Sequence, residues 1–306
     1  MNEERKSIFQ QPMWVSIFAL TAAIAWGWAY PLIKLGFDEF GITKDMTGSK
    51  MLFAGIRFAI SGFIILSIAT LTKRTLKVST QHGWSYILIF ALLNTTLHYT
   101  FFYIGLSHSE GARAAILNSL GVFLLVLLAC LFYKSDKLTM RKIIGCGIGF
   151  TGILALNLGN DGGNGFNFLG DGMIILNTIC SAFAGIMTRR LGNYADVFTA
   201  TGYSLAIGGI MLIVPGMFLG GTMPVVTFSG ISILMSLVGI STLGFTLYNK
   251  LLTCNPVGKI AIFNSLIPIV GAVTSSLCLD EPFYWKYLLA AILATTGIYI
   301  INKGKG

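Results

Sequence analysis

Long runs of hydrophobic residues alternate with short polar segments along the whole 306-residue chain. Each run has about twenty residues, the length that an α-helix needs to cross the roughly 30 Å hydrocarbon core of a membrane. Because the connections are short, consecutive helices are expected to pack as antiparallel neighbours in one bundle. The pattern predicts an all-α integral membrane protein with ten spanning helices, at residues 14–36, 50–72, 84–106, 111–133, 139–158, 168–190, 197–219, 230–252, 258–279 and 285–302.

Composition supports this fold class. The chain is 55% hydrophobic and 11% charged, with a mean hydropathy of +0.77, and a soluble domain of this composition would expose a largely apolar surface. The first run is longer than the roughly 7–15 apolar residues of a signal peptide, and no small-residue cleavage site follows, so we expect a retained helix. The five cysteines lack metal-ligand spacing, and we expect neither a bound metal nor a disulfide framework.

The net charge of +9 is distributed unevenly among the connections. An excess of Lys and Arg marks the cytoplasmic side of a membrane protein. We therefore expect a plasma-membrane protein with both termini in the cytoplasm, whose basic residues meet lipid headgroups rather than nucleic acid. The basic connections lie around 73–77, 134–142, 189–190 and 250–259, and those around 159–167 and 220–229 contain no Lys or Arg.

Two short motifs occur twice at nearly the same spacing. Asn118-Ser119-Leu120 recurs 146 positions later as Asn264-Ser265-Leu266, and Thr151-Gly152-Ile153 recurs 145 positions later as Thr296-Gly297-Ile298. Two motifs that repeat at one spacing argue against coincidence. We therefore predict two related five-helix repeats, at 14–158 and 168–302, joined by an extracytoplasmic linker at 159–167.

The odd number of helices in each repeat fixes how the repeats are related. The first repeat enters the membrane from the cytoplasm, so the second must enter from the outside. The two repeats are then inverted, related by a pseudo-twofold axis in the membrane plane, which is typical of secondary transporters. When each repeat adopts the conformation that the other had, a central site that was open to one side of the membrane opens to the other side.

Several stretches of the chain also resemble a known family. They are Asn264-Ser265-Leu266-Ile267-Pro268-Ile269-Val270-Gly271-Ala272, Leu279-Asp280-Glu281-Pro282, Trp26-Gly27-Trp28-Ala29-Tyr30-Pro31 with Lys34, and Arg57-Phe58. In these stretches the chain resembles the EamA family of the drug/metabolite transporter superfamily, and the resemblance extends over essentially the whole length. It implies a ten-helix transporter that exports small metabolites such as amino acids.

Polar and aromatic residues within the predicted spans indicate which helix faces point inward. A polar group is costly in hydrocarbon unless it is paired or faces water. Asn118 and Asn264 occupy equivalent places in the two repeats, where a central site is expected. For each residue the alternative is a simple contact between helices. The predicted cavity residues are Trp26, Tyr30, Asn94, His98, Tyr99, Asn118, Thr178, Ser181, Tyr248 and Asn264.

Two cations and two prolines within the spans have possible mechanical roles. Arg57 lies about seven residues into its span and needs a partner. It holds carbonyls or helix ends at an outer gate, or it recognises a substrate carboxylate. Lys34, near the outer end of the first span, is a second gate candidate. Pro31 and Pro268 are candidate hinges, with a plain packing kink as the alternative.

Charged residues at the ends of the spans have simpler expected roles. We expect Glu110 and Arg113, at the start of the fourth span, to be interfacial charges. Asp136 and Glu281, which lie 145 positions apart, are expected to cap or pair at the starts of helices. The small-residue pair Gly145 and Gly149 indicates close helix packing, within the protomer or in a homodimer.

These features favour a secondary transporter that moves a small organic metabolite by alternating access, without a cofactor. One alternative is a membrane-embedded lipid-modifying enzyme, which would need a catalytic cluster, and the three histidines are scattered. Another alternative is a non-transporting membrane subunit. The chain contains no P-loop motif, which argues against an ATP-driven pump.

Overall fold

A computed structural model describes residues 7–133, 137–155, 165–255, 260, 262–281 and 284–302. Over these residues the chain is helical and contains no β-strand. Of the predicted linker, only 165–167 lies within the described residues, and Asp136 lies outside them.

Seven helical segments among the described residues are long and apolar enough to cross a membrane. Three of them change helix type or break along their length. The seven are α1 (Pro12–Glu39), α2 (Thr47–Leu71), α3 (Gln81–Ala91) with η2 (Leu92–Leu97) and α4 (His98–Ser107), α5 (Gly111–Asn118) with α6 (Leu120–Phe132), η3 (Phe168–Gly172) with α8 (Met173–Thr188), α9 (Val197–Phe218) and α10 (Phe228–Cys254).

Shorter helices occupy the other predicted spans. They are α7 (Met140–Ala155), η5 (Ile262–Ser265) with α12 (Leu266–Cys278), and α13 (Trp285–Asn302). Single turns η1 (Ile8–Gln10) and η4 (Leu191–Asn193) lie outside the spans. Because α7 has 16 residues and α12 has 13, both are shorter than the roughly twenty residues that span a bilayer. The structure thus confirms several apolar spanning helices, and the count of ten stays a prediction.

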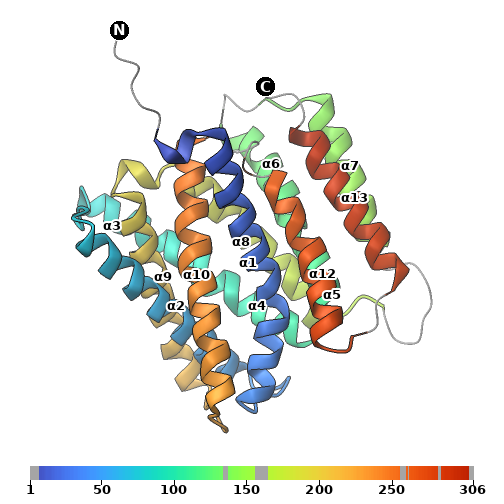
Figure 1. The fold of residues 1–306 in the computed structure, drawn as a ribbon, viewed down its shortest axis with the longest axis horizontal. Helices are drawn as coiled ribbons and strands as arrows, with labels where there is room; N and C mark the ends of the chain where they lie inside the picture. Colours follow the sequence, from blue (N-terminus) through green and yellow to red (C-terminus); the bar gives the residue numbers. More distant parts are fainter. Residues whose placement is uncertain are drawn as a thin grey trace.

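The helices pack into one bundle with two flanks (Figure 1). On one flank α2 packs against α9, and on the other α7 packs against α13. Between the flanks, α1 packs against α10 and α12, and α8 packs against α4 and α6. Helix α1 begins and α13 ends at the same end of the bundle.

Glycines bring the backbones of the flanking helices into contact. A Cβ atom added at Gly62 of α2 would lie 2.2 Å from the backbone N of Ala206 in α9. On the other flank, a Cβ atom at Gly297 of α13 would lie 2.4 Å from the carbonyl O of Gly145 in α7. The predicted small-residue face at Gly145 therefore packs against α13 within the protomer.

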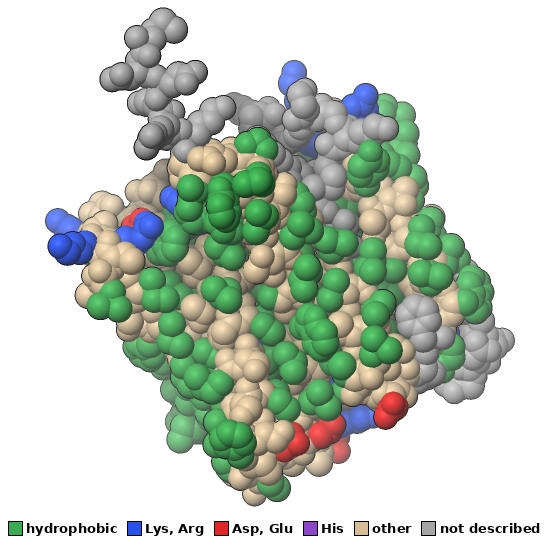
Figure 2. Space-filling model, viewed as in Figure 1, with side chains coloured by type: hydrophobic (Ala, Val, Ile, Leu, Met, Phe, Trp, Pro, Cys, Tyr) green, Lys and Arg blue, Asp and Glu red, His purple; other side chains and the backbone are tan. Residues whose placement is uncertain are grey.

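The outer surface of the bundle is apolar. In Figure 2, hydrophobic side chains cover the middle of the visible face, Lys and Arg gather toward its upper part, and Asp and Glu gather at its lower edge. Large side chains such as Leu131 (79% exposed) and Phe218 (87% exposed) project outward from α6 and α9. Together with the long apolar helices, this surface indicates a multi-pass membrane protein.

Candidate substrate cavity

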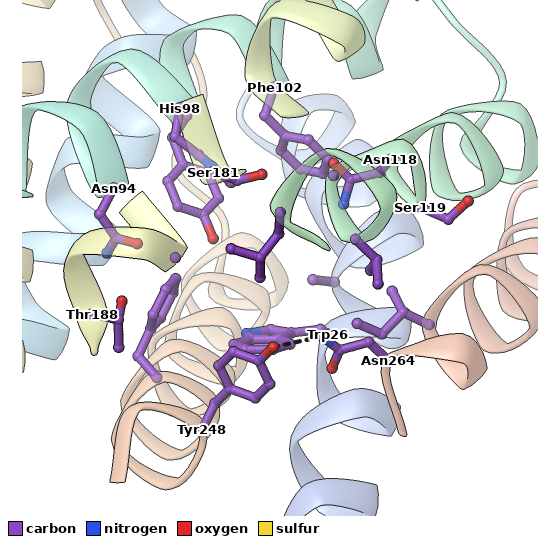
Figure 3. Close-up of a pocket in the computed structure, with 18 of the residues that line it drawn as sticks. Trp26, Asn94, His98, Phe102, Asn118, Ser119, Ser181, Thr188, Tyr248 and Asn264 are labelled. Atoms are coloured by element: carbon purple, nitrogen blue, oxygen red, sulfur yellow. Dashed lines mark hydrogen bonds between the residues drawn. The ribbon is translucent and has the colours of Figure 1, made fainter. Parts of the chain in front are cut away.

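A cavity of about 180 Å³ lies between helices from both halves of the chain. Nine of the ten predicted cavity residues line it, and Figure 3 shows several of them. Thr178 does not: it is fully buried, and its hydroxyl donates to the carbonyl of Ile175 at 2.7 Å. The nine are Trp26, Tyr30, Asn94, His98, Tyr99, Asn118, Ser181, Tyr248 and Asn264.

Neither copy of the repeated Asn-Ser-Leu motif lies within one continuous α-helix. Asn118 is the last residue of α5, and the N–H of Ser119 bonds to a carbonyl three residues earlier, before α6 begins. Asn264 lies in the tight turns of η5, directly before α12. Interrupted helices that meet in the middle of a bundle are typical of transporter binding sites.

The two asparagines have different partners. The Oδ1 of Asn118 accepts a hydrogen bond of 2.6 Å from the Nδ2 of Asn177 in α8. The Nδ2 of Asn264 donates a hydrogen bond of 2.7 Å to the Tyr248 hydroxyl in α10 (Figure 3). Asn177 was not among the predicted residues, although its position within an apolar span gives the same signal as that of the other asparagines.

A wide helical turn, η2, positions Asn94 in the third span. Such π-helical turns are rare and frequently occur at functional sites. The Nδ2 of Asn94 and the Nδ1 of His98, which follows η2, are buried and have no hydrogen-bond partner among the described residues. Both side chains line the cavity (Figure 3), so a ligand there could satisfy them.

Aromatic rings form much of the rest of the wall. The Trp26 ring lies edge-on to Phe245 and Tyr248, with ring centroids 5.5 and 5.0 Å apart. The Trp26 Nε1 is buried without a hydrogen-bond partner among the described residues. Apolar faces with a few polar groups between them suit a small molecule that has an apolar body and a polar end.

Arg57 is a charged residue of the cavity wall. It is 1% exposed, and its Nε donates to the Leu237 carbonyl at 3.1 Å and to the Ser241 hydroxyl at 2.7 Å. Its Nη1 donates to the Tyr103 hydroxyl at 2.9 Å. These contacts fit the expectation that Arg57 holds a carbonyl, but they lie beside the central cavity.

Lys34 lies outside this cavity, in a polar pocket of about 240 Å³ at the end of the bundle where α1 finishes. Its Nζ lies 2.5 Å from the Oε1 of Glu281. The Oε2 of Glu281 accepts a hydrogen bond of 2.8 Å from the N–H of Gly111, the first residue of α5. Glu281 was expected to cap or pair at the start of a helix, and it does both, by pairing with Lys34 and capping α5.

Arg113 was expected to be an interfacial charge, and the structure pairs it within the protein. It is 6% exposed, and it forms two hydrogen bonds of 2.7 Å with the carboxylate of Asp171, which is 2% exposed. A carboxylate partner offsets part of the cost of burying an arginine. Arg113 and Asp171 lie 58 positions apart, so the spacing of residues along the chain gave no sign of the pair.

The two prolines differ in position. Pro31 is buried within α1 and does not line the cavity, whereas Pro268 lies in α12 and does. Within the described ranges, no group of three or more His, Cys, Asp and Glu side chains is arranged to hold a metal ion.

Comparison with known proteins identifies the family. The model of the EamA-like transporter family matches residues 13–158 and again residues 168–303. The chain belongs to the EamA-like transporter family. It is therefore a multi-pass membrane protein from a family of transporters, as the sequence motifs predicted.

Individual relatives resemble this family member over most of its length. It is 26% identical over 287 residues to the uncharacterized transporter YvbV of Bacillus subtilis, covering 91% of this chain and 88% of the relative. It is 22% identical over 294 residues to a probable amino-acid metabolite efflux pump of Escherichia coli, covering 93% of both chains. A solved crystal structure, 16% identical, covers 94% of this chain and 97% of its own with a TM-score of 0.70, so the two share a fold.

Proposed function

We propose that this protein is a secondary transporter that exports a small, amino-acid-like metabolite across the plasma membrane by alternating access. The observation that carries the proposal is the cavity of about 180 Å³ enclosed by both halves of the chain. For scale, a cavity of about 150 Å³ holds a molecule of the size of benzene. The nine predicted residues in its wall are the proposed substrate contacts.

Family membership favours transport over a lipid-modifying enzyme or a non-transporting subunit. The Escherichia coli relative is named as an amino-acid metabolite efflux pump. That name supports an amino-acid-like substrate and the outward direction for this chain.

Helix packing supports ten spans in two inverted repeats, 14–158 and 168–302, with residues 159–167 as the linker. If α1 corresponds to α8, the main helix contacts made by one half have counterparts in the other. Helix α1 packs against α10 and α12 of the second half, and α8 packs against α4 and α6 of the first half. In the pairs α2–α9 and α7–α13, each helix packs against the helix that corresponds to it in the other half. A pseudo-twofold axis in the membrane plane generates this reciprocal pattern.

Helix α1 begins and α13 ends at one end of the bundle (Figure 1). This end faces the cytoplasm. The excess of Lys and Arg on that side supports this orientation. The cavity extends toward the same end, because its wall includes Thr188, the last residue of α8, and Leu252, near the end of α10. We therefore assign this structure to a state that opens toward the cytoplasm.

Lys34 and Glu281 form the gate at the outer end. Their ion pair joins α1 of the first half to the segment that follows α12 in the second half. It is a contact that must break when the cavity opens outward. Pro31 and Pro268 are the proposed hinges, because a proline within a helix removes one backbone hydrogen bond and permits bending.

Export is tested by growth of expressing cells on toxic levels of single amino acids, followed by counterflow in proteoliposomes. We expect Asn118→Leu and Asn264→Leu each to lower flux about tenfold without loss of membrane insertion, because each removes a polar contact in the wall. Leu243→Ala, at a 56% exposed position of α10, is the control and should leave flux unchanged. Normal flux in both asparagine variants would remove the cavity assignment.

Orientation is tested with single cysteines in a chain whose native cysteines are replaced by serine. Asn167→Cys, just before η3, should react with a membrane-impermeant maleimide added outside the cell. Lys77→Cys, between α2 and α3, should react after the membrane is opened. Reaction of both from the same side would contradict the inverted repeats.

A further inference from the structure

Arg57 carries a buried charge that has no counter-ion among the described residues. Its partners are a carbonyl and two hydroxyls, all neutral. Among the described residues, no ion pair involves Arg57, and no Asp or Glu lines the central cavity. All the acidic residues of the chain lie in the tail, the loops or the ends of the predicted spans.

Lys34 and Arg113, two cations at the outer end, differ from Arg57 in this respect. Lys34 is paired with Glu281, and Arg113 is paired with Asp171. A cation that is removed from water without an opposite charge is costly. The protein supplies that opposite charge for Lys34 and Arg113, whereas the described residues of the cavity wall include no acid that could do so for Arg57.

Arg57 belongs to the same wall as the unpartnered indole of Trp26. The guanidinium carbon of Arg57 lies 6.0 Å from the centroid of the Tyr99 ring. The Tyr99 ring lies 6.3 Å from Phe245, which lies 5.5 Å from Trp26. The indole Nε1 is a donor only, so this wall offers a positive charge and a free donor to an acceptor group.

We propose that Arg57 is the fixed charge that selects the substrate, so that the cavity takes small organic molecules with a carboxylate or another acidic group and rejects simple amines. The inference rests on the proposed transport function and adds a charge rule to it. In a largely apolar cavity a single charge acts over several ångströms, because little water is present to screen it. The carboxylate of the bound molecule then provides the missing counter-ion.

The test uses three probes that share one branched alkyl group and differ in charge: 4-methylpentanoate, L-leucine and 3-methylbutylamine. Binding to the purified full-length protein is measured by the rise in its thermal unfolding midpoint over a concentration series. We expect the carboxylate and leucine to bind at least about tenfold more tightly than the amine, as is typical of one close charge interaction.

Three variants separate charge from structure. Arg57→Gln should abolish the preference for a carboxylate. The Ser241 hydroxyl lies 2.7 Å from the Arg57 Nε, so Ser241→Asp places an acid beside the guanidinium. This variant should also abolish the preference for a carboxylate, although the arginine is still present. Tyr103→Phe removes a hydrogen bond of Arg57 but keeps its charge, and the preference should persist.

Two results would overturn the charge rule. One is equal binding of the amine and the carboxylate to the unaltered protein. The other is an unchanged preference in both Arg57→Gln and Ser241→Asp. If the unaltered protein binds none of the probes while the cells still export a metabolite, the transport function stands and the charge rule fails.

Discussion

The flanks of the bundle and its centre are held together by different kinds of contact. On the flanks, glycines such as Gly62 and Gly297 bring the backbone of one helix against that of its neighbour. In the centre, helices meet through aromatic rings and single hydrogen bonds such as that between Asn264 and Tyr248. Backbone contacts permit one arrangement, whereas side chains can change rotamer and partner. The flanks therefore suit a fixed frame, and the centre suits a site that changes shape.

The largest effect is expected on the flanks, from Gly62→Ala. The new Cβ would lie 2.2 Å from the backbone N of Ala206, and a backbone atom cannot move aside without separating α2 from α9. Overpacking of this kind costs about 1–3 kcal/mol or more, and we expect a clear loss of thermal stability in detergent.

The control for this substitution is Gly147→Ala in α7, where the added Cβ meets no atom within 4 Å. Alanine is the better helix former, so stability should be unchanged or slightly raised. Equal stability of the two variants would show that the flanks are not a fixed frame.

An intermediate effect is expected in the centre, from Gly244→Ala in α10. The added Cβ would lie 2.7 Å from the Trp26 Nε1, so the indole must shift in the cavity wall while the fold persists. Misplacement of a binding group is costly, and we expect flux to fall about tenfold with little change in stability. Gly239→Ala lies in the same helix with no atom within 4 Å and should transport normally. Equal flux in the two variants would argue against a role for Trp26.

The smallest effect is expected from Thr178→Val, a substitution of nearly the same shape. The Thr178 hydroxyl bonds to a carbonyl of its own helix and does not line the cavity. Hydrogen bonds in membrane helices contribute under about 1 kcal/mol on average, so flux and stability should both remain close to normal. A large loss of flux would extend the substrate site beyond the cavity wall to Thr178.

The sequence was informative where a local pattern carries the signal. Apolar runs predicted the spanning helices, and the repeated motif containing Asn118 and Asn264 predicted two residues that the structure brings to one cavity. The sequence was uninformative where a partner lies far along the chain. The ion pair of Arg113 and Asp171 joins residues 58 positions apart. The hydrogen bond of Asn118 and Asn177 joins residues 59 positions apart.

By itself, the sequence determined that this is a multi-pass membrane protein of the EamA-like family, because hydrophobicity and motifs are properties of continuous stretches. The tertiary structure alone decided which side chains meet. An α-helix turns by about 100° per residue, so adjacent positions face different neighbours. In α8, Asn177 reaches Asn118 while Thr178 turns to its own backbone. That choice depends on how each helix is rotated against the others, and no local pattern specifies it.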